Sequence, residues 1–328
     1  MEFLPVHVYS TAPESSRYAD GSDVIEAIDQ FGSWCDASGV TGALVYTDNR
    51  LIDPWLAAQR LIMSSQVHPL VAVQPVYMHP YSVAKMVASL TWLYDRRVDM
   101  NFVAGGFRGD LLALGDQTHH DDRYERLIEY ADIVLGLLKG EAVTFGGAHH
   151  RVMNLRLRME VPEALQPHLT LAGSSPAGLA AANRLGAVPV QYPSPDYDPA
   201  ALTGSHGVRV GLITGASAGE AWEEAHRRFP DDPEGARLHA MAMKMSDSDW
   251  HRAIAQSRGR GGPYWYGPFE RHQSFCPYLV GSVDDVASEL RRLAAGGVDT
   301  FILDIPESGE DLRAAVKTFA AAGLDIVR

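Results

Sequence analysis

The sequence predicts a (β/α)8 barrel formed by a single domain over residues 1–328. Eight short apolar segments alternate along the chain with amphipathic segments, which is the pattern that this barrel requires. A length of 328 residues fits one large barrel or two domains. An open, doubly wound sheet is the competing fold, but Val8-Tyr9-Ser10-Thr11 lacks the glycine fingerprint that follows the first strand of a nucleotide-binding sheet. The barrel is therefore the favoured fold class.

Eight apolar runs are predicted to be the barrel strands. Each is short, rich in Val, Leu, Ala or Phe, and bounded by polar residues, Gly or Pro, as buried strands are. In chain order they span 3–8, 42–46, 70–73, 100–103, 169–172, 188–191, 208–213 and 301–303.

Amphipathic helices are predicted between these strands. In the first of them, over 23–38, Val24, Ile28 and Phe31 recur at three- and four-residue steps, and Gly39 ends the helix. The remaining helices are predicted over 55–63, 82–94, 122–138, 177–185, 218–228, 283–295 and 310–321, with a hairpin over 143–158.

Residues 229–277, between the seventh and eighth strands, are predicted to be an insertion because they are too long for a simple loop. The segment has helical patterns over 236–245 and 250–256 and a Gly/Arg-rich stretch over 257–262. Its position predicts a mobile lid at the active-site end of the barrel.

Composition excludes several classes of protein. Hydrophobic residues make up 46% and charged residues 21%, as in a soluble globular protein. The chain carries 28 Lys+Arg against 41 Asp+Glu, a net charge of −13, which disfavours nucleic-acid and anionic-membrane partners. Two cysteines cannot form a disulfide scaffold, and neither a signal peptide nor an 18-residue apolar span is evident. We therefore expect a soluble, cytoplasmic protein.

Barrel active sites lie at the C-terminal ends of the strands. The side chains and glycines selected by this rule are His7, Tyr9, Tyr46, Asp48, Gln74, Asn101, Gly105, Gly106, Gly173, Ser174, Ser175, Tyr192, Arg209 and Asp304. Arg209 is predicted to stabilise an anion, or alternatively to form an ion pair with Asp304 inside the barrel. Asp304 is a candidate for acid–base chemistry.

Gly173-Ser174-Ser175 stands directly between a predicted strand and a helix. A helix N-terminus offers free N–H groups and the positive end of a dipole, so this turn predicts a phosphate site. The alternative is a plain N-cap, since Ser is a favoured capping residue.

The segment His119-His120-Asp121-Asp122-Arg123-Tyr124 precedes the longest predicted helix. It could cap that helix, or Arg123 and Tyr124 could contact a phosphate or ring while His120 makes a hydrogen bond. We predict no metal site, because further ligands do not follow at a suitable spacing. Trp265 lies in an aromatic cluster that either packs in the core or forms a wall over a flat ligand.

Taken in order, several segments resemble the bacterial luciferase-like flavin-dependent monooxygenases, in particular the alkanesulfonate and aminopolycarboxylate monooxygenase branch. No single segment is decisive, but the ordered set is specific and covers nearly the whole chain. The segments that carry the resemblance include Phe3-Leu4-Pro5-Val6-His7, Leu70-Val71-Ala72-Val73-Gln74-Pro75, Asn101-Phe102-Val103-Ala104-Gly105-Gly106, His120-Asp121-Asp122-Arg123-Tyr124-Glu125 and Gly173-Ser174-Ser175.

The resemblance implies a (β/α)8 barrel with an insertion after strand seven. It also implies reduced FMN as a diffusible cosubstrate, supplied by a separate NAD(P)H:flavin reductase. Oxygen would form a C4a-peroxyflavin that oxidises a small or medium organic substrate. Members of the family are commonly homodimers or homotetramers, so a homo-oligomer is expected.

The same resemblance assigns roles to individual residues. His7, Arg209 and Asp304 become the catalytic candidates, with His7 donating a hydrogen bond or a proton. The flavin ring is assigned to Asn101, Gly105 and Gly106, and the ribityl phosphate to His120, Arg123, Tyr124, Gly173, Ser174 and Ser175. The substrate is assigned to Tyr9, Tyr46, Tyr192, Trp265 and Arg271.

Departures from the family pattern argue against alkanesulfonate as the substrate. The sulfonate-cleaving relatives carry a Cys where this chain has Leu51, a His where it has Gly211, and a Tyr where it has Pro306. The flavin site is expected to be retained while the substrate pocket differs.

Three alternatives remain. The barrel family also contains deazaflavin (F420)-dependent hydride-transfer enzymes, and a non-catalytic flavin-binding protein would show the same motifs. A phosphate-binding isomerase or aldolase is disfavoured, because no Lys or carboxylate pair stands at the strand ends.

Overall fold

The computed structural model describes residues 3–106, 108–244 and 262–328. The predicted helix over 250–256 and residues 257–261 of the Gly/Arg-rich stretch lie outside the described residues.

Eight strands follow one another in the order of the predicted barrel. β12, β1, β2, β3, β4, β7 and β8 are neighbours in that order, and β9 pairs with both β8 and β12, so the order closes on itself. This topology confirms the (β/α)8 barrel. The strands are β1 (Leu4–Thr11), β2 (Gly42–Val45), β3 (His68–Val73), β4 (Asp99–Val103), β7 (Leu169–Ala172), β8 (Val188–Gln191), β9 (His206–Gly215) and β12 (Val298–Leu303).

The helices between the strands begin where polar side chains cap them. Ser282 and Ser308 each form a capping box with an aspartate three residues on, and His79 accepts from the backbone N–H of Tyr81. A His cap gave no sequence signal, so the third helix begins two residues earlier than predicted. The helices are α1 (Gly21–Ser38), α2 (Pro54–Ser64), α3 (Pro80–Tyr94), α5 (His120–Leu138), α6 (Pro176–Leu185), α7 (Ala218–Arg228), α8 (Pro233–Lys244), α11 (Val283–Ala295) and α12 (Gly309–Ala321).

Several short elements among the described residues were not predicted from the sequence. They include α4 (Arg108–Ala113), α10 (Gly267–Glu270) and the strand β13 (Leu324–Ile326), which pairs with β1. Their length of three to six residues leaves too few positions for a periodic pattern to be recognised.

The chain forms two compact units. Unit 1 comprises Met1–Pro13, Gln30–Ala43 and Val190–Arg328, and unit 2 comprises Glu14–Asp29 and Leu44–Pro189. The prediction of one domain with an insertion at 229–277 remains a prediction.

In unit 1, β9 is longer than a barrel strand needs to be. Its residues up to Val210 pair with β12, whereas Gly211–Gly215 pair in parallel with β11 (Tyr278–Ser282). β11 in turn pairs antiparallel with β10 (Tyr264–Trp265). The sequence analysis predicted neither β10 nor β11 as a strand.

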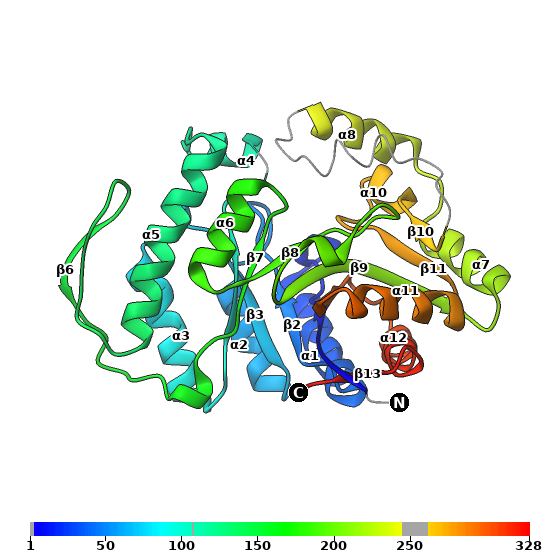
Figure 1. Ribbon diagram of the computed structural model, residues 1–328, viewed down its shortest axis with the longest axis horizontal. Coiled ribbons are helices and arrows are strands. Elements are labelled where there is room, and N and C mark those ends of the chain that lie inside the picture. The colour runs from blue at the N-terminus through cyan, green and yellow to red at the C-terminus, as the bar shows by residue number, and fades with distance from the viewer. Residues whose placement is uncertain (1–2, 107, 245–261) are drawn as a thin grey trace. The chain divides into compact units, whose positions relative to one another are not determined.

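In unit 2, α5 packs against α3 and α6, and it carries the hairpin of β5 (Val143–Gly146) and β6 (Arg151–Leu155) along its side (Figure 1). The Glu129 carboxylate on α5 accepts hydrogen bonds from the backbone N–H groups of Ala148, His149 and His150 at 2.7, 2.8 and 2.8 Å. Burial alone would raise the pKa of Glu129, but these three donors lower it. An ionised carboxylate therefore anchors the tip of the hairpin.

Replacing this carboxylate tests the anchor. In Glu129→Gln, we expect the amide protons of residues 148–150 to exchange at least about tenfold faster, because charge-assisted hydrogen bonds to them are lost. Hydrogen exchange measured residue by residue checks this. Glu125→Gln, at an exposed position on the same helix, is the control and should leave the exchange unchanged. Equal exchange rates in both variants would contradict the anchoring role.

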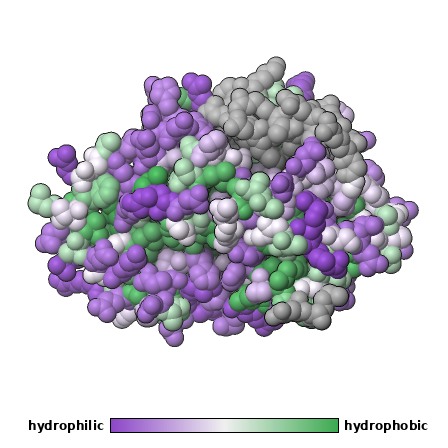
Figure 2. Space-filling model, viewed as in Figure 1, coloured by the Kyte–Doolittle hydropathy of each residue, from purple (hydrophilic) through white to green (hydrophobic). Residues whose placement is uncertain are grey.

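The visible surface is largely hydrophilic (Figure 2), and both cysteines lie in the interior. Figure 2 shows hydrophilic residues over much of the visible face, with hydrophobic residues between them. Among the described residues, no helix is long and apolar enough to cross a membrane. Cys35 and Cys276 are both buried and unbridged, and Cys35 packs in the core.

Candidate functional site

The candidate site residues form two groups, each within one unit. The candidates for binding a flavin lie in unit 2, at the ends of β4 and β7 and the beginnings of α5 and α6. Arg209, Asp304, Tyr192 and His7 lie in unit 1, on or after β9, β12, β8 and β1.

Ser175 is the N-cap of α6, and its Oγ accepts a hydrogen bond from the backbone N–H of Gly178 at 3.1 Å. Pro176 occupies the first helical position, where a missing N–H costs nothing. The capping interpretation is thus realised in the structure. A cap and an anion site are compatible, because a helix start has several N–H groups without intrahelical partners.

Tyr124 stands against this turn from α5. Its hydroxyl hydrogen-bonds Ser175, and burial raises the pKa of the phenol, so that the hydroxyl stays protonated. A Cβ at Gly173 would lie 2.6 Å from the Tyr124 hydroxyl oxygen, and one at Gly178 would lie 3.1 Å from it. Glycine at both positions is therefore what allows Tyr124 to reach the helix start. The turn has the hydroxyl and N–H donors that fit a phosphate.

Arg123 supports a second turn, directly after β4. Its side chain is buried at 2% exposure, and Nη1 donates to the carbonyl oxygen of Gly105 at 2.8 Å. Gly105 has φ +105°, a conformation that favours glycine, and a Cβ there would lie 3.0 Å from Leu111. A Cβ at Gly106 would meet no atom within 4 Å among the described residues. Arg123 thus fixes a turn whose exposed glycine leaves room for a ring.

The other unit 2 candidates have partners of their own. Asn101 on β4 is buried, and its Oδ1 accepts from Thr170 Oγ1 at 2.8 Å on the neighbouring strand. His120 Nδ1 lies 2.7 Å from Asp121 Oδ1, and its ring packs edge-on against Tyr124. Tyr46 is half-buried directly after β2. Their predicted contacts with flavin or substrate remain predictions.

Arg209 and Asp304 approach each other in unit 1, with Arg209 Nη2 3.8 Å from Asp304 Oδ1. Asp304 Oδ2 accepts from Ser274 Oγ and from the Tyr278 hydroxyl, each at 2.7 Å. Burial opposes the charged form of Asp304, but Arg209 and the two hydroxyls lower its pKa. Asp304 is therefore ionised at neutral pH, and the ion pair left open by the sequence is present. A role of Asp304 in proton transfer remains a prediction.

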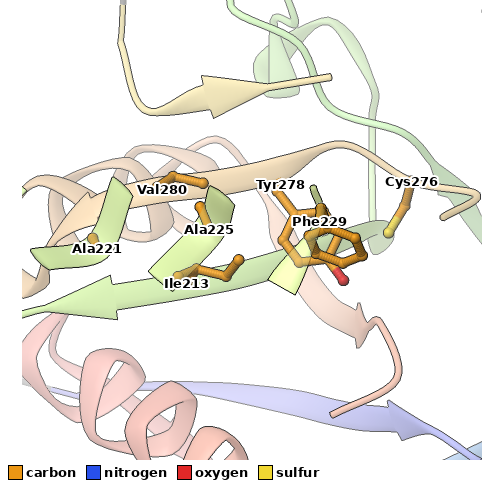
Figure 3. Close-up of a cluster of buried hydrophobic side chains, with 7 residues drawn as sticks. All are labelled: Ile213, Ala221, Ala225, Phe229, Cys276, Tyr278 and Val280. Carbon is orange, nitrogen blue, oxygen red and sulfur yellow. The ribbon is translucent and has the colours of Figure 1, made fainter. Parts of the chain in front are cut away.

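Tyr192 and Cys276 lie beside this pair. Burial raises the pKa of Tyr192, which follows β8 and hydrogen-bonds Arg209. Burial also raises the pKa of the Cys276 thiol, so it stays protonated and unreactive. Figure 3 shows Cys276 near the rings of Phe229 and Tyr278, in a cluster of buried apolar side chains.

The remaining unit 1 candidates each pack against or pair with other residues. They are His7, Tyr9, Trp265 and Arg271. His7 is half-buried on β1 opposite Thr300, and Tyr9 is a core side chain with 1% exposure. The Trp265 ring lies 5.5 Å from that of Trp222, so the packing interpretation of this aromatic cluster is realised. Arg271 forms an ion pair with Asp231. Their roles toward substrate remain predictions.

Sequence reasoning missed three residues around Asp304. They are Ser274, Tyr278 and Arg228, which donates to the carbonyl oxygen of Ile305 and lies near Asp311. A signal existed at Gly211, because a glycine inside an apolar strand indicates the close approach of another group. Here that group is the ring of Tyr278. Among the described residues, no group of three or more His, Cys, Asp or Glu side chains could hold a metal.

Comparisons with known proteins identify relatives of this chain. A family model described as luciferase-like monooxygenase matches residues 4–300. The chain is 29% identical over 321 residues to the 4-(gamma-L-glutamylamino)butanoyl-[BtrI acyl-carrier protein] monooxygenase BtrO of Niallia circulans, covering 93% of this chain and 94% of that one.

Solved structures show the same fold. EDTA monooxygenase EmoA from Chelativorans sp. BNC1 superposes with a TM-score of 0.70 at 16% identity, over 98% of this chain and 95% of that one. The oxygenating constituent of the 3,6-diketocamphane monooxygenase of Pseudomonas putida, solved in complex with FMN, superposes with a TM-score of 0.68 at 13% identity, over 99% and 98%.

Proposed function

Because this chain belongs to the luciferase-like monooxygenase family, and is therefore an oxidoreductase, we propose that it is a two-component monooxygenase that uses reduced FMN and O2. A separate NAD(P)H:flavin reductase supplies the flavin in this proposal, and the enzyme works in the cytoplasm as a homodimer or homotetramer. The observation that carries the proposal is the turn at the start of α6. The hydroxyls of Ser175 and Tyr124 lie there beside a helix N-terminus, and Gly173 leaves the space that Tyr124 needs.

In the proposed complex, unit 2 binds the flavin. Gly173, Ser174 and Ser175 hold its phosphate, with the Tyr124 hydroxyl beside them, while Gly105 and Gly106 border its ring. Arg123 keeps the backbone of Gly105 in place through its hydrogen bond to the carbonyl. Bound reduced FMN supplies the two electrons with which one oxygen atom of O2 enters the substrate and the other becomes water.

Unit 1 supplies the polar groups that act on the substrate. The Arg209 cation is nearly buried, with 14% of its side chain exposed, so it stabilises developing negative charge more strongly than a solvated arginine does. Asp304 orients it through an ion pair and Tyr192 through a hydrogen bond. His7 contributes a hydrogen bond from β1. We propose a polar acyl compound as the substrate, as the name of the relative BtrO states for that enzyme.

Oxygen consumption tests the proposed function. The protein is mixed with photoreduced FMN and each member of a panel of acyl compounds, including the pantetheine thioester of 4-(γ-L-glutamylamino)butanoate. We expect one compound to gain an oxygen atom from 18O2. Parallel reactions with reduced F420 under anaerobic conditions test the hydride-transfer alternative. The proposed monooxygenase activity would be refuted if no compound gained an oxygen atom and the protein instead reduced a compound with F420.

The phosphate site makes a separate prediction. In Ser175→Ala, we expect the dissociation constant of reduced FMN to rise at least about tenfold, because a hydroxyl donor and the support of Tyr124 are lost. Ser217→Ala is the matched control, since Ser217 caps α7 through the backbone N–H of Glu220. Both variants should lose about 1 kcal/mol of stability. Anaerobic titration and urea unfolding measure the two effects, and equal FMN affinities in both variants would count against this phosphate site.

A further inference from the structure

Tyr278 occupies space that only a glycine at position 211 leaves open. The two residues are register neighbours on the paired strands β11 and β9. A Cβ at Gly211 would overlap the atoms of the Tyr278 ring. The ring is 1% exposed and lies close against the backbone of Gly211 on β9, two residues beyond Arg209.

The two carboxylate oxygens of Asp304 have separate partners. Oδ2 accepts from the Tyr278 hydroxyl and from Ser274 Oγ, both at 2.7 Å. Oδ1 faces Arg209 Nη2 at 3.8 Å. Because the two hydroxyls occupy one oxygen, the carboxylate plane is fixed and its other oxygen is directed at the guanidinium.

The Tyr278 ring is itself held on two sides. The Phe229 ring packs edge-on at 5.0 Å between centroids, and the Arg228 guanidinium lies 5.8 Å from the Tyr278 centroid (Figure 3 shows the two rings). Arg228 also donates to the carbonyl oxygen of Ile305, the residue after Asp304. The Tyr278 hydroxyl and the Asp304 carboxylate are therefore held by the same group of packed side chains.

We propose that Tyr278 is a positioning residue, which, together with Ser274, holds Asp304 so that Arg209 keeps the orientation in which it meets the substrate. This inference rests on the proposed function. The Tyr278 hydroxyl stays protonated and able to donate to Asp304, because burial and the neighbouring carboxylate raise its pKa. Its contribution is geometric and acts through Asp304.

Tyr278→Phe tests the role, since it removes the hydroxyl and keeps the ring against Gly211. The probe is the pantetheine thioester of 4-(γ-L-glutamylamino)butanoate, or whichever compound the oxygen-incorporation panel identifies. We expect KM to rise about tenfold through the misplaced Arg209, while the dissociation constant of reduced FMN stays unchanged. Ser274→Ala should act in the same direction, and the double variant should exceed either one.

Tyr264→Phe is the matched control. Tyr264 is half-buried on β10, next to β11, and its hydroxyl donates to Glu289 Oε1 at 2.7 Å. This variant also loses a hydroxyl–carboxylate hydrogen bond in unit 1, but not the one to Asp304. Its KM should equal that of the unchanged enzyme. Equal KM values in Tyr278→Phe and Tyr264→Phe would overturn the proposal.

Crystal structures of the two variants give a readout that needs no substrate. In Tyr278→Phe, we expect the Asp304 carboxylate to rotate and its contact with Arg209 to change, whereas Tyr264→Phe should preserve both. If no compound is oxidised by the unchanged enzyme, the proposed function fails, and the structures alone decide the positioning role. An unaltered Arg209–Asp304 pair in Tyr278→Phe would then overturn it.

Discussion

Asp304→Asn is expected to lower the free energy of unfolding by about 3–5 kcal/mol, the loss that follows when one partner of a buried ion pair is removed. The side chains of Asp304 and Arg209 are only 10% and 14% exposed. The negative carboxylate also attracts the positively charged guanidinium of Arg228. Its neutralisation therefore leaves two nearly buried guanidinium groups without their shared anion. Urea unfolding at pH 7 measures the effect.

Two comparisons make this result specific. Asp132→Asn removes the partner of Arg184, whose side chain is 59% exposed, so that variant should lose only about 0–1 kcal/mol. Arg209→Met combined with Asp304→Asn should recover part of the loss, because the unpaired cation is removed as well. A loss in Asp304→Asn no greater than that in Asp132→Asn would mean that the pair is effectively solvated.

The pH dependence of the same effect has a definite sign. The pKa of Asp304 is lowered in the folded protein, so the carboxylate binds protons less readily there than in the unfolded chain. Its contribution to stability is therefore complete above its ordinary pKa near 4 and disappears as the pH falls through the lower, folded value. The difference between the unchanged protein and Asp304→Asn should shrink below about pH 4.

Gly173→Ala is expected to produce the largest loss of flavin binding from a single methyl group. The added Cβ would lie 2.6 Å from the hydroxyl oxygen of Tyr124, a rigid and buried ring that cannot move aside freely. Displacing that ring breaks its hydrogen bond to Ser175 and distorts the start of α6. We expect the dissociation constant of reduced FMN to rise about 100-fold, corresponding to about 3 kcal/mol.

A second glycine provides the control for this substitution. Gly219 lies in the first turn of α7, and a Cβ there would meet only Ser217 Oγ at 3.8 Å, which is ordinary contact. Gly219→Ala should leave FMN binding unchanged and slightly stabilise the helix. Anaerobic titration with photoreduced FMN compares the two variants. Unaltered affinity in Gly173→Ala would exclude the turn before α6 as the phosphate site.

The barrel was predictable because its strands and helices depend on local patterns. Buried apolar runs and three- and four-residue steps identify elements whose partners are adjacent in the sequence. The rule that barrel sites lie at strand ends then selected Arg209 and Asp304, which the structure brings together. Whether they pair could not be decided, because that depends on side-chain packing across different strands.

Tyr278 and Arg123 show what local sequence patterns leave undecided. Tyr278 reaches Asp304 only because β11 pairs with β9, two strands separated by the whole of residues 216–277. No local sequence pattern predicts such a pairing. The sequence analysis assigns Arg123 to the ribityl phosphate, which remains a prediction, and the structure shows that Arg123 also donates to the carbonyl oxygen of Gly105. A buried arginine that supports a turn and an arginine that binds an anion have the same sequence signature.

β9 pairs with β12 along its first part and with β11 along its second part. This arrangement affects how the segment between β9 and β11 can change in length. Pairing of Gly211–Gly215 with β11 joins the two ends of the segment over residues 216–277. Once such ends are joined, the entropy cost of closing the loop grows only logarithmically, by about 0.6 kcal/mol for each doubling of its length. Lengthening this segment therefore adds little to the entropy cost of closing it, provided that α7, β10 and Ser274, which pack against or bond to the rest of unit 1, are kept.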